Sequence, residues 1–234
     1  MITIPYHYSQ MMKWFWNNYP SMFQRFLDSI HHNQIEGKTW LVDSLDNVQI
    51  PRDKDGKFKV EVIGGWFGFP LIDLLLSKYG DDVKHIDFYE PDKFCCKIFT
   101  NYCHFYFDEV EVLPAEFLRV RKGDNWIMIH IFNMNYFNAT VHRRVHLVVN
   151  PSSEHMPSMT TMRQYYELPE RTLLALQSND KDDEPDHMNC VKSSQELAQQ
   201  AGIRELFGGT MKLITRDKDN RKQHFNRFMV LGKW

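Results

Sequence analysis

The sequence predicts an α/β fold built on a mostly parallel β-sheet, with a helical segment at the amino end. Three observations support this prediction. Short β-rich runs alternate with helical runs through the middle of the chain, the first fifth shows helical spacing only, and two β-rich runs close the sequence. Strands joined through helices run parallel by right-handed crossovers, whereas two strands joined by a short turn pair antiparallel. At 234 residues, the chain fits one large domain.

Residues 1–48 are expected to form an N-terminal helical segment packed on the core, and residues 49–234 the α/β domain. Apolar side chains recur at the helical spacing: Met12, Phe15, Trp16, Tyr19, Phe23, Phe26, Leu27 and Ile30. Pro20 followed by Ser21 predicts a break and a new helix start. The segment either covers a ligand pocket or flanks the core, and the packing role is favoured.

The remaining elements follow in order. The expected strands are 58–63, 85–89, 126–132, 145–150 and 171–177, with a closing antiparallel pair near 207–214 and 225–231. The expected helices are 70–79, 93–107 and 194–201. Residues 108–124 do not fit this rhythm, because Glu109 to Leu113 alternates like a strand. That stretch is either an inserted ribbon or the third strand itself.

The charge balance restricts the partners. With 28 basic and 30 acidic residues, the chain lacks the basic excess of proteins that rely on phosphate contacts. A local basic run contains Lys212, Arg216, Lys218, Arg221, Lys222 and Arg227. Asp217 and Asp219 interrupt this run, which favours a solvated hairpin over a nucleic-acid contact. A nucleic-acid partner is therefore unsupported, though not excluded.

The cysteines and the apolar runs indicate the compartment. The four cysteines form no Cys-x-x-Cys pair, which is typical of reduced thiols. No apolar run reaches the roughly 18 residues of a membrane span, and the first residues do not resemble a signal peptide. We expect a soluble, cytoplasmic protein without a membrane partner.

A glycine turn follows the first expected strand. Gly64, Gly65 and Gly68 come directly after the buried run, with Trp66 among them. Glycines at this position let backbone N–H groups approach a ligand closely, at the strand ends where α/β folds form their crevice. Glycine-ended strands are common in α/β proteins, so this signal is weak when taken alone.

An acidic residue follows at the end of the second expected strand. Glu90 lies about 20 residues beyond the glycine turn, a position from which a carboxylate accepts both hydroxyls of a ribose. The alternative is a glutamate that only forms a turn before Pro91. Taken together, the glycine turn and Glu90 favour an adenosine-type ligand.

The strand order, the glycine turn, the acid after the second strand and the closing hairpin resemble class I S-adenosylmethionine-dependent methyltransferases. More narrowly, residues 150–156 (NPSSEHM) resemble an Asn-x-Ser-x-Glu-His-Met motif of uncharacterised methyltransferase-like proteins from bacteria and phages. Residues 33–38, 176–180, 187–190 and 227–232 look like further blocks of that group, so the resemblance covers about residues 30–234. It implies a Rossmann-like sheet and S-adenosylmethionine as cofactor, bound by Gly64, Gly65, Trp66, Gly68, Glu90, Asn133 and Met134.

Three positions depart from the family pattern. Val62 replaces the acid that usually precedes the first glycine by two residues, and Trp66 replaces the middle glycine. Asn133 stands where the family tends to carry an acid for the adenine amino group, although an amide also hydrogen-bonds adenine and Met134 can pack on its face. These departures motivate a second interpretation, a binding or assembly protein of phage or bacterial origin that retains the fold without the chemistry.

Residues after the fourth strand are the candidates for catalysis. Asn150 resembles the first position of the Asn-Pro-Pro-Tyr motif of amino-group methyltransferases, but no aromatic residue follows to stack a base. Glu154 and His155 instead place a carboxylate and an imidazole above the expected pocket, and a histidine can remove a proton near neutral pH. The alternative is that both make structural hydrogen bonds. Asn150, Glu154 and His155 are the predicted catalytic residues.

Glu154, His155, His187 and Cys190 could gather around a metal ion. The pattern lacks the tight ligand pairs of structural zinc sites, so the sequence predicts no metal site. Asn179, His187 and Asn189 are expected to line the acceptor side of the crevice. The predicted reaction is methyl transfer to a small-molecule, peptide or nucleotide acceptor. Transfer of the cofactor's aminocarboxypropyl arm is an alternative that fold analogy does not separate from it.

Overall fold

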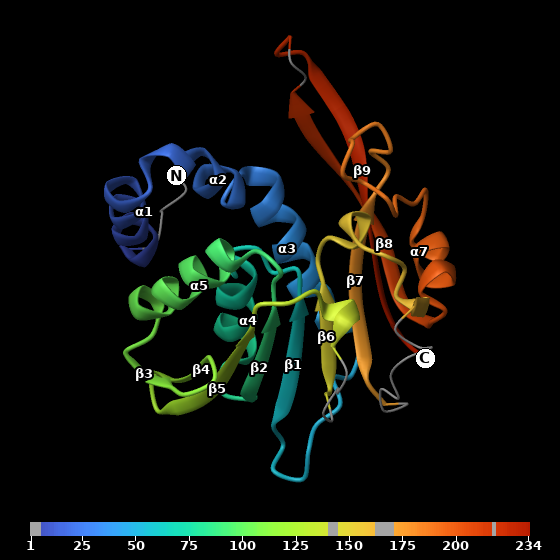
Figure 1. Ribbon diagram of the computed structural model, residues 1–234. Coiled ribbons are helices and arrows are strands. Elements are labelled where there is room, and N and C mark those ends of the chain that lie inside the picture. Colours follow the sequence, from blue (N-terminus) through green and yellow to red (C-terminus); the bar gives the residue numbers. More distant parts are fainter. Residues whose placement is uncertain (1–5, 140–144, 162–170, 217–218) are drawn as a thin grey trace.

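The computed structural model describes residues 6–139, 145–161, 171–216 and 219–234. Within these residues, nine strands form one sheet in the order β3-β4-β5-β2-β1-β6-β7-β9-β8 (Figure 1). The strands are β1 Phe58–Ile63, β2 Val83–Tyr89, β3 Glu109–Leu113, β4 Phe117–Lys122, β5 Asn125–Phe132, β6 Leu147–Asn150, β7 Leu173–Asn179, β8 Arg204–Arg216 and β9 Lys222–Lys233. The mixed α/β fold with a mostly parallel centre confirms the prediction.

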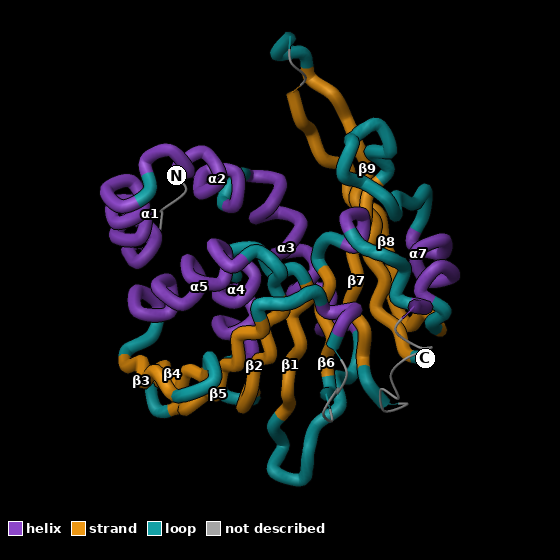
Figure 2. Tube along the Cα trace, viewed as in Figure 1, coloured by secondary structure: helices purple, strands orange, loops and turns teal. Residues whose placement is uncertain are grey.

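The parallel centre consists of five strands. β1 pairs with β2 and β6, β2 pairs with β5, and β6 pairs with β7, all parallel. The connecting helices are α4 Leu71–Tyr79 and α5 Lys93–Tyr106. Because these strands run in the same direction, their carboxyl ends lie together at one end of the molecule. The loops that follow them meet there (Figure 2).

Residues 108–124 form a ribbon at one edge of the sheet. β3 pairs antiparallel with β4, and β4 pairs antiparallel with β5. At the other edge, α7 Ser194–Ala201 precedes β8, and β9 lies antiparallel between β7 and β8. The β8–β9 hairpin continues past the body of the molecule, beyond the carboxyl ends of the parallel strands (Figure 1).

The described part of the N-terminal segment, residues 6–48, contains three helices and two 3-10 turns. They are α1 Tyr6–Asn18, η1 Pro20–Met22, α2 Phe23–Ser29, α3 His32–Ser44 and η2 Leu45–Asn47. The break at Pro20 is present, but α2 begins at Phe23 without a side-chain cap, so Ser21 does not cap it. A second break separates α2 from α3, where Nδ1 of His31 accepts the backbone N–H of Asn33.

Apolar side chains pack on both faces of the sheet. In β6, Leu147 and Val149 face the larger core with helices α1 to α5, whereas Val148 faces a smaller core with α7. This alternation along a strand buried on both faces explains why 147–149 is continuously apolar. Among the described helices, none is both long and apolar enough to cross a membrane.

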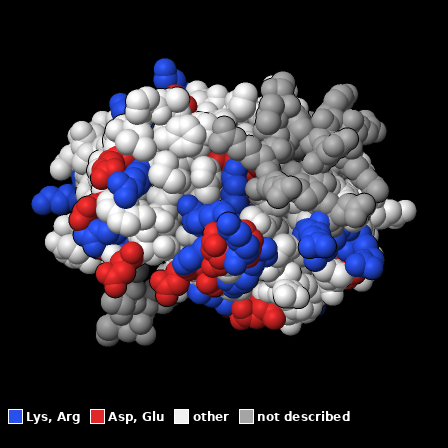
Figure 3. Space-filling model, turned by 90° about the horizontal axis from the view of Figure 1, so that it is seen from below, with Lys and Arg blue, Asp and Glu red and all other residues white. Residues whose placement is uncertain are grey.

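The opposite end of the molecule, around the amino ends of the parallel strands, carries charges of both signs. Lysine and arginine side chains intermingle with aspartate and glutamate over the centre of this face (Figure 3). Several of them are paired there, for example Arg52 with Asp82 at 2.7 Å. Such pairing leaves little unopposed basic surface for phosphate contacts at the centre of this face.

Candidate functional site

A cavity of about 630 Å³ opens at the carboxyl ends of β1, β2 and β6. Its lining includes Gln34 and Lys38 of α3, Gly64 and Glu90 at the ends of β1 and β2, and five residues after β6, which are Pro151, Ser152, His155, Met156 and Pro157. This volume lies within the usual range of small-molecule sites, and its position is where parallel α/β sheets bind ligands. We call it the main cavity.

The glycine turn divides into residues that line the main cavity and residues that serve packing. Gly64 lines it with a left-handed φ of 58°, and a Cβ there would come within 2.1 Å of the Met156 methyl. A Cβ at Gly65 or Gly68 would instead meet the buried ring of Phe88 or Phe99. Those two glycines therefore allow the turn to pack closely against β2 and α5, and they do not line the cavity.

Trp66 also lines the main cavity, and its backbone is in the left-handed region at φ 54°. This conformation is costly for a bulky residue. It directs the Trp66 N–H to Oε2 of Glu90 at 2.9 Å, while the indole stacks on Phe67. Trp66 therefore connects the turn after β1 to the acid after β2 and does not fill the cavity.

Glu90 lies at the end of β2 and is largely buried. Burial raises the pKa of its carboxyl group, and the N–H groups of Asp92 and Trp66 oppose that rise. Each oxygen accepts one of these two N–H groups, at 3.0 and 2.9 Å. Since a carboxylate has about four acceptor positions, Glu90 retains capacity for two further donors.

Asn133 and Met134 lie outside the lining of the main cavity, and both are exposed. The Asn133 amide donates to the backbone oxygens of Glu90 at 3.1 Å and Pro91 at 2.9 Å. It thereby holds the loop that carries Glu90. The residues of this loop that do line the cavity are Asn135 and Tyr136.

Asn150 is completely buried beneath the turn that follows β6. Its Oδ1 accepts the Ser152 N–H at 3.1 Å, and its Nδ2 faces the sulfur atoms of Met156 and Met159 at 3.4 and 3.9 Å. Asn150 therefore shapes the loop and lines neither cavity of the site.

A second cavity of about 360 Å³ adjoins the main one, between α3, the loop after β6, the loop after β7 and the β8–β9 hairpin. The two cavities share Gln34, Ser152 and His155 in their lining. Asn179 and His187 also line this smaller cavity. Asn189 does not, but it donates its backbone N–H to the Glu154 carbonyl at 3.1 Å.

Glu154 and His155 are neighbours in sequence but have different surroundings. His155 is part-exposed on the rim between the two cavities. The Glu154 side chain is buried beside the smaller cavity, where its Oε1 accepts the Asn179 amide at 2.8 Å. The guanidinium of Arg227 lies 3.5 Å from the same oxygen. His155 can therefore reach ligands in both cavities, and Glu154 only those in the smaller one.

Two buried cations at the site were not predicted. Lys38 lines the main cavity, where burial, and then the charge of Arg227, lower the pKa of its amine to about 7. Arg227 was expected in a solvated hairpin but is buried, and it donates to the Pro151 carbonyl at 3.0 Å. Gly37 makes room for it, because a Cβ there would lie 3.1 Å from Arg227 Cδ. The only sequence signal was their place in two blocks of the family resemblance, 33–38 and 227–232.

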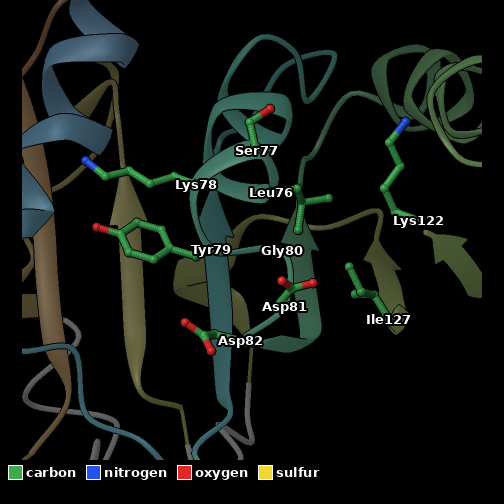
Figure 4. Close-up of a pocket in the computed structure, with 9 residues that line it drawn as sticks. All are labelled: Leu76, Ser77, Lys78, Tyr79, Gly80, Asp81, Asp82, Lys122 and Ile127. Carbon is green, nitrogen blue, oxygen red and sulfur yellow. The ribbon is translucent and has the colours of Figure 1, made fainter. Parts of the chain in front are cut away.

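Another cavity, of about 380 Å³, lies between the end of α4, the start of β2 and the edge ribbon (Figure 4). The side chains of Lys78, Asp82 and Lys122 point in different directions and do not converge (Figure 4). This cavity lies away from the carboxyl ends of the parallel strands, so it is not the candidate site.

Solved structures with the same architecture are numerous. A methyltransferase of Leishmania major, named as dependent on S-adenosylmethionine, is 14% identical, with a TM-score of 0.52 over 96% of this chain and 82% of its own. A candidate methyltransferase of Bacillus halodurans is 11% identical, with a TM-score of 0.56 over 82% of this chain and 97% of its own. A protein of Methanosarcina mazei, named among S-adenosylmethionine-dependent methyltransferases, is 9% identical, with a TM-score of 0.52 over 80% of this chain and 95% of its own.

This chain has the fold of class I S-adenosylmethionine-dependent methyltransferases. No protein-family model and no curated protein sequence matches it. At these identities the likeness concerns the fold, so the function of this methyltransferase fold has to be argued from its own side chains.

Proposed function

We propose that the protein is an S-adenosylmethionine-dependent methyltransferase that binds its cofactor in the main cavity and its acceptor in the smaller one. The observation that carries the proposal is Glu90. A buried carboxylate with spare acceptor positions stands beside the tight turn at Gly64, at the mouth of a cavity of about 630 Å³.

The residues around the main cavity fit an adenosine-containing cofactor. Glu90 would accept the two ribose hydroxyls, Gly64 would admit the ligand close to the backbone, and Trp66 would contribute to the wall. The loop of Asn133 and Met134 would border the adenine, with Asn135 and Tyr136 nearest to it. When bound, the cofactor supplies a methyl group on a positively charged sulfur.

The residues proposed to act on the acceptor lie where the main cavity and the smaller cavity adjoin. His155 lines both cavities, so its imidazole can orient an acceptor atom or remove its proton where the two ligands meet. Glu154 would support the imidazole from its buried position beside the smaller cavity. Asn150 would act indirectly, by fixing the loop that carries His155. Holding two reactants in line supplies much of the rate gain in such transfers. The acceptor class remains a small molecule, a peptide or a nucleotide.

Calorimetric titration with S-adenosylmethionine and S-adenosylhomocysteine tests this proposal. We expect micromolar binding, and a 10- to 100-fold loss of affinity in Glu90→Gln. This loss equals about 1.4–2.7 kcal/mol, the size expected for hydrogen bonds to a charged group. Affinity should also fall with decreasing pH earlier than for an ordinary glutamate, because the raised pKa of Glu90 causes protonation at higher pH. Glu36→Gln is the matched control and should bind normally, because Glu36 lies on α3 with its side chain 43% exposed and does not line the main cavity.

Absence of binding at millimolar ligand would contradict the proposal. It would favour the alternative of a binding or assembly protein, which is suggested by the Met156 methyl lying over Gly64. If the cofactor binds, the products identify the transferred group. Methyl transfer leaves S-adenosylhomocysteine, whereas transfer of the aminocarboxypropyl arm leaves methylthioadenosine.

A further inference from the structure

We propose that Glu154, His155 and His187 form a three-ligand site for a divalent transition-metal ion beside the smaller cavity. One ligand atom from each residue lies within 4.8 Å of the other two. Ligand atoms that share an ion in tetrahedral geometry, through bonds of about 2.1 Å, lie about 3.4 Å apart. Side-chain shifts that together amount to about 1 to 1.5 Å would therefore close the site.

Backbone hydrogen bonds explain why these residues meet although His187 is distant in sequence. The carbonyl of Glu154 accepts the N–H groups of Met188 at 2.8 Å and Asn189 at 3.1 Å. This folds the segment after β7 back over the turn η4 Ser153–His155. The rings of His155 and His187 consequently lie 4.6 Å apart and nearly perpendicular.

Both imidazoles have the second polar partner that metal-binding histidines usually have. Nδ1 of His187 lies 2.6 Å from the carbonyl oxygen of Lys181. A carbonyl only accepts, so this contact places the ring proton on Nδ1 and leaves Nε2 available. Nδ1 of His155 faces the Asp186 carboxylate at 3.1 Å, with the same consequence. Metal-binding histidines typically donate their other N–H to a carbonyl or a carboxylate in this way.

The third ligand carries the strongest argument. Glu154 is only 1% exposed, and within the described part of the chain its Oε2 has no hydrogen-bond partner. A buried, unpaired carboxylate oxygen is costly. Asn179 and Arg227 both approach the other oxygen, Oε1, which leaves Oε2 for a cation.

Two imidazoles and one carboxylate select for zinc, iron, cobalt or manganese over magnesium and calcium, which prefer oxygen ligands alone. Three protein ligands leave a coordination position open, and both histidines line the smaller cavity. An acceptor oxygen or nitrogen bound there would lose its proton more readily. With an ion present, His155 acts as a ligand and not as the base, so this inference refines the acceptor side of the proposed function.

Cobalt(II) titration of the chelator-treated full chain, followed by visible absorption, tests the site, and zinc calorimetry gives the affinity. We expect one equivalent bound at micromolar or lower concentration, and at least a 100-fold loss in His187→Ala. Zinc should also raise the melting temperature of the parent protein but not that of the variant. His32→Ala is the matched control, because His32 is exposed and has a nearby carboxylate, Glu36 at 3.1 Å.

No binding at millimolar cobalt or zinc would overturn the proposal, and so would unchanged affinity in His187→Ala. Cys190→Ser should retain the ion. If it lost the ion while His187→Ala kept it, the ligand set would be wrong. Cofactor titrations repeated in excess chelator separate the two proposals, because the main cavity does not require Glu154 or His187.

Discussion

Lys38 is a basic residue in a buried position, with only 5% of its surface exposed to water. Burial and the nearby Arg227 lower the pKa of its amine to about 7, and only Asp73 acts in the opposite direction. In the unfolded chain this pKa is about 10.4. Folding therefore releases a proton between about pH 7 and pH 10, so the free energy of unfolding should rise with pH across that window.

Lys38→Met tests whether the buried amine causes this pH dependence of the free energy of unfolding. The apolar chain keeps the volume and removes the buried charge, so at pH 6 the variant should gain on the order of 2 kcal/mol. The gain should shrink by pH 9, where the parent lysine is already neutral in the folded state. Urea unfolding at several pH values measures it, with the exposed Lys93→Met as control. Parallel pH curves for the parent and Lys38→Met would refute the argument.

The residues of the site differ in how far sequence could locate them. Glu90 and Gly64 stand at strand ends, and in a parallel sheet strand ends converge whatever the rest of the chain does. Lys38 and Arg227 come from a helix and a hairpin, and their burial depends on packing that no local pattern encodes. Asn133 shows the reverse case. It follows β5 as the sequence predicts, but it lies outside the lining of the main cavity and its amide holds a loop.

At the scale of elements, α1 is attached to α4 and α5 through one carboxylate. The hydroxyls of Tyr8 and Tyr102 both donate to Asp73, and His7 Nε2 lies 3.4 Å from it. Burial, followed by the charge of Asp73, raises the pKa of both tyrosines. Both hydroxyls therefore stay protonated and continue to donate at physiological pH.

Tyr8→Phe should lower the free energy of unfolding by about 1–3 kcal/mol, because a hydrogen bond to a buried charge is lost. Thermal denaturation measures the change. Tyr6→Phe alters a side chain that is 76% exposed and should stay within about 0.5 kcal/mol of the parent protein. Equal effects of the two substitutions would show that the Tyr8 hydroxyl does not hold α1 in place.

Most elements were predictable because their periodicity is strong, and the helix at 194–201 matches α7 at both ends. The ribbon at 108–124 was not, since alternation identifies a strand without identifying its partner. The break before α3 was also missed, because a histidine cap at His31 is not among the common helix-start signals. In both cases the deciding factor is a contact with another part of the fold, which a local sequence pattern does not reveal.

At the scale of the molecule, residues 6–48 share the core of the α/β domain. Phe15, Phe26 and Leu41 are fully buried in the same cluster as Phe67 and Phe69 after β1. Helix α3 also lines both cavities of the site. The boundary expected near residue 48 therefore separates an all-helical segment from the α/β segment. It does not separate two hydrophobic cores, because apolar side chains from both segments pack in one cluster.

A chain beginning at residue 49 should fail to fold cooperatively, since the apolar surface that covers β1 and α4 would be gone. The full chain should unfold in one transition that circular dichroism and tryptophan fluorescence report together. Size-exclusion chromatography and thermal melts check both statements. A sharp, reversible melt of the shortened chain would contradict the shared core.

His155 belongs to the walls of two cavities at once, and this has a thermodynamic consequence. Any ligand that fixes its imidazole changes the free energy with which the neighbouring cavity accepts its own ligand. Such coupling is reciprocal, so each ligand must alter the affinity of the other by the same factor. The two cavities thus behave as one linked system, in which the order of filling alters neither the final state nor its total binding free energy.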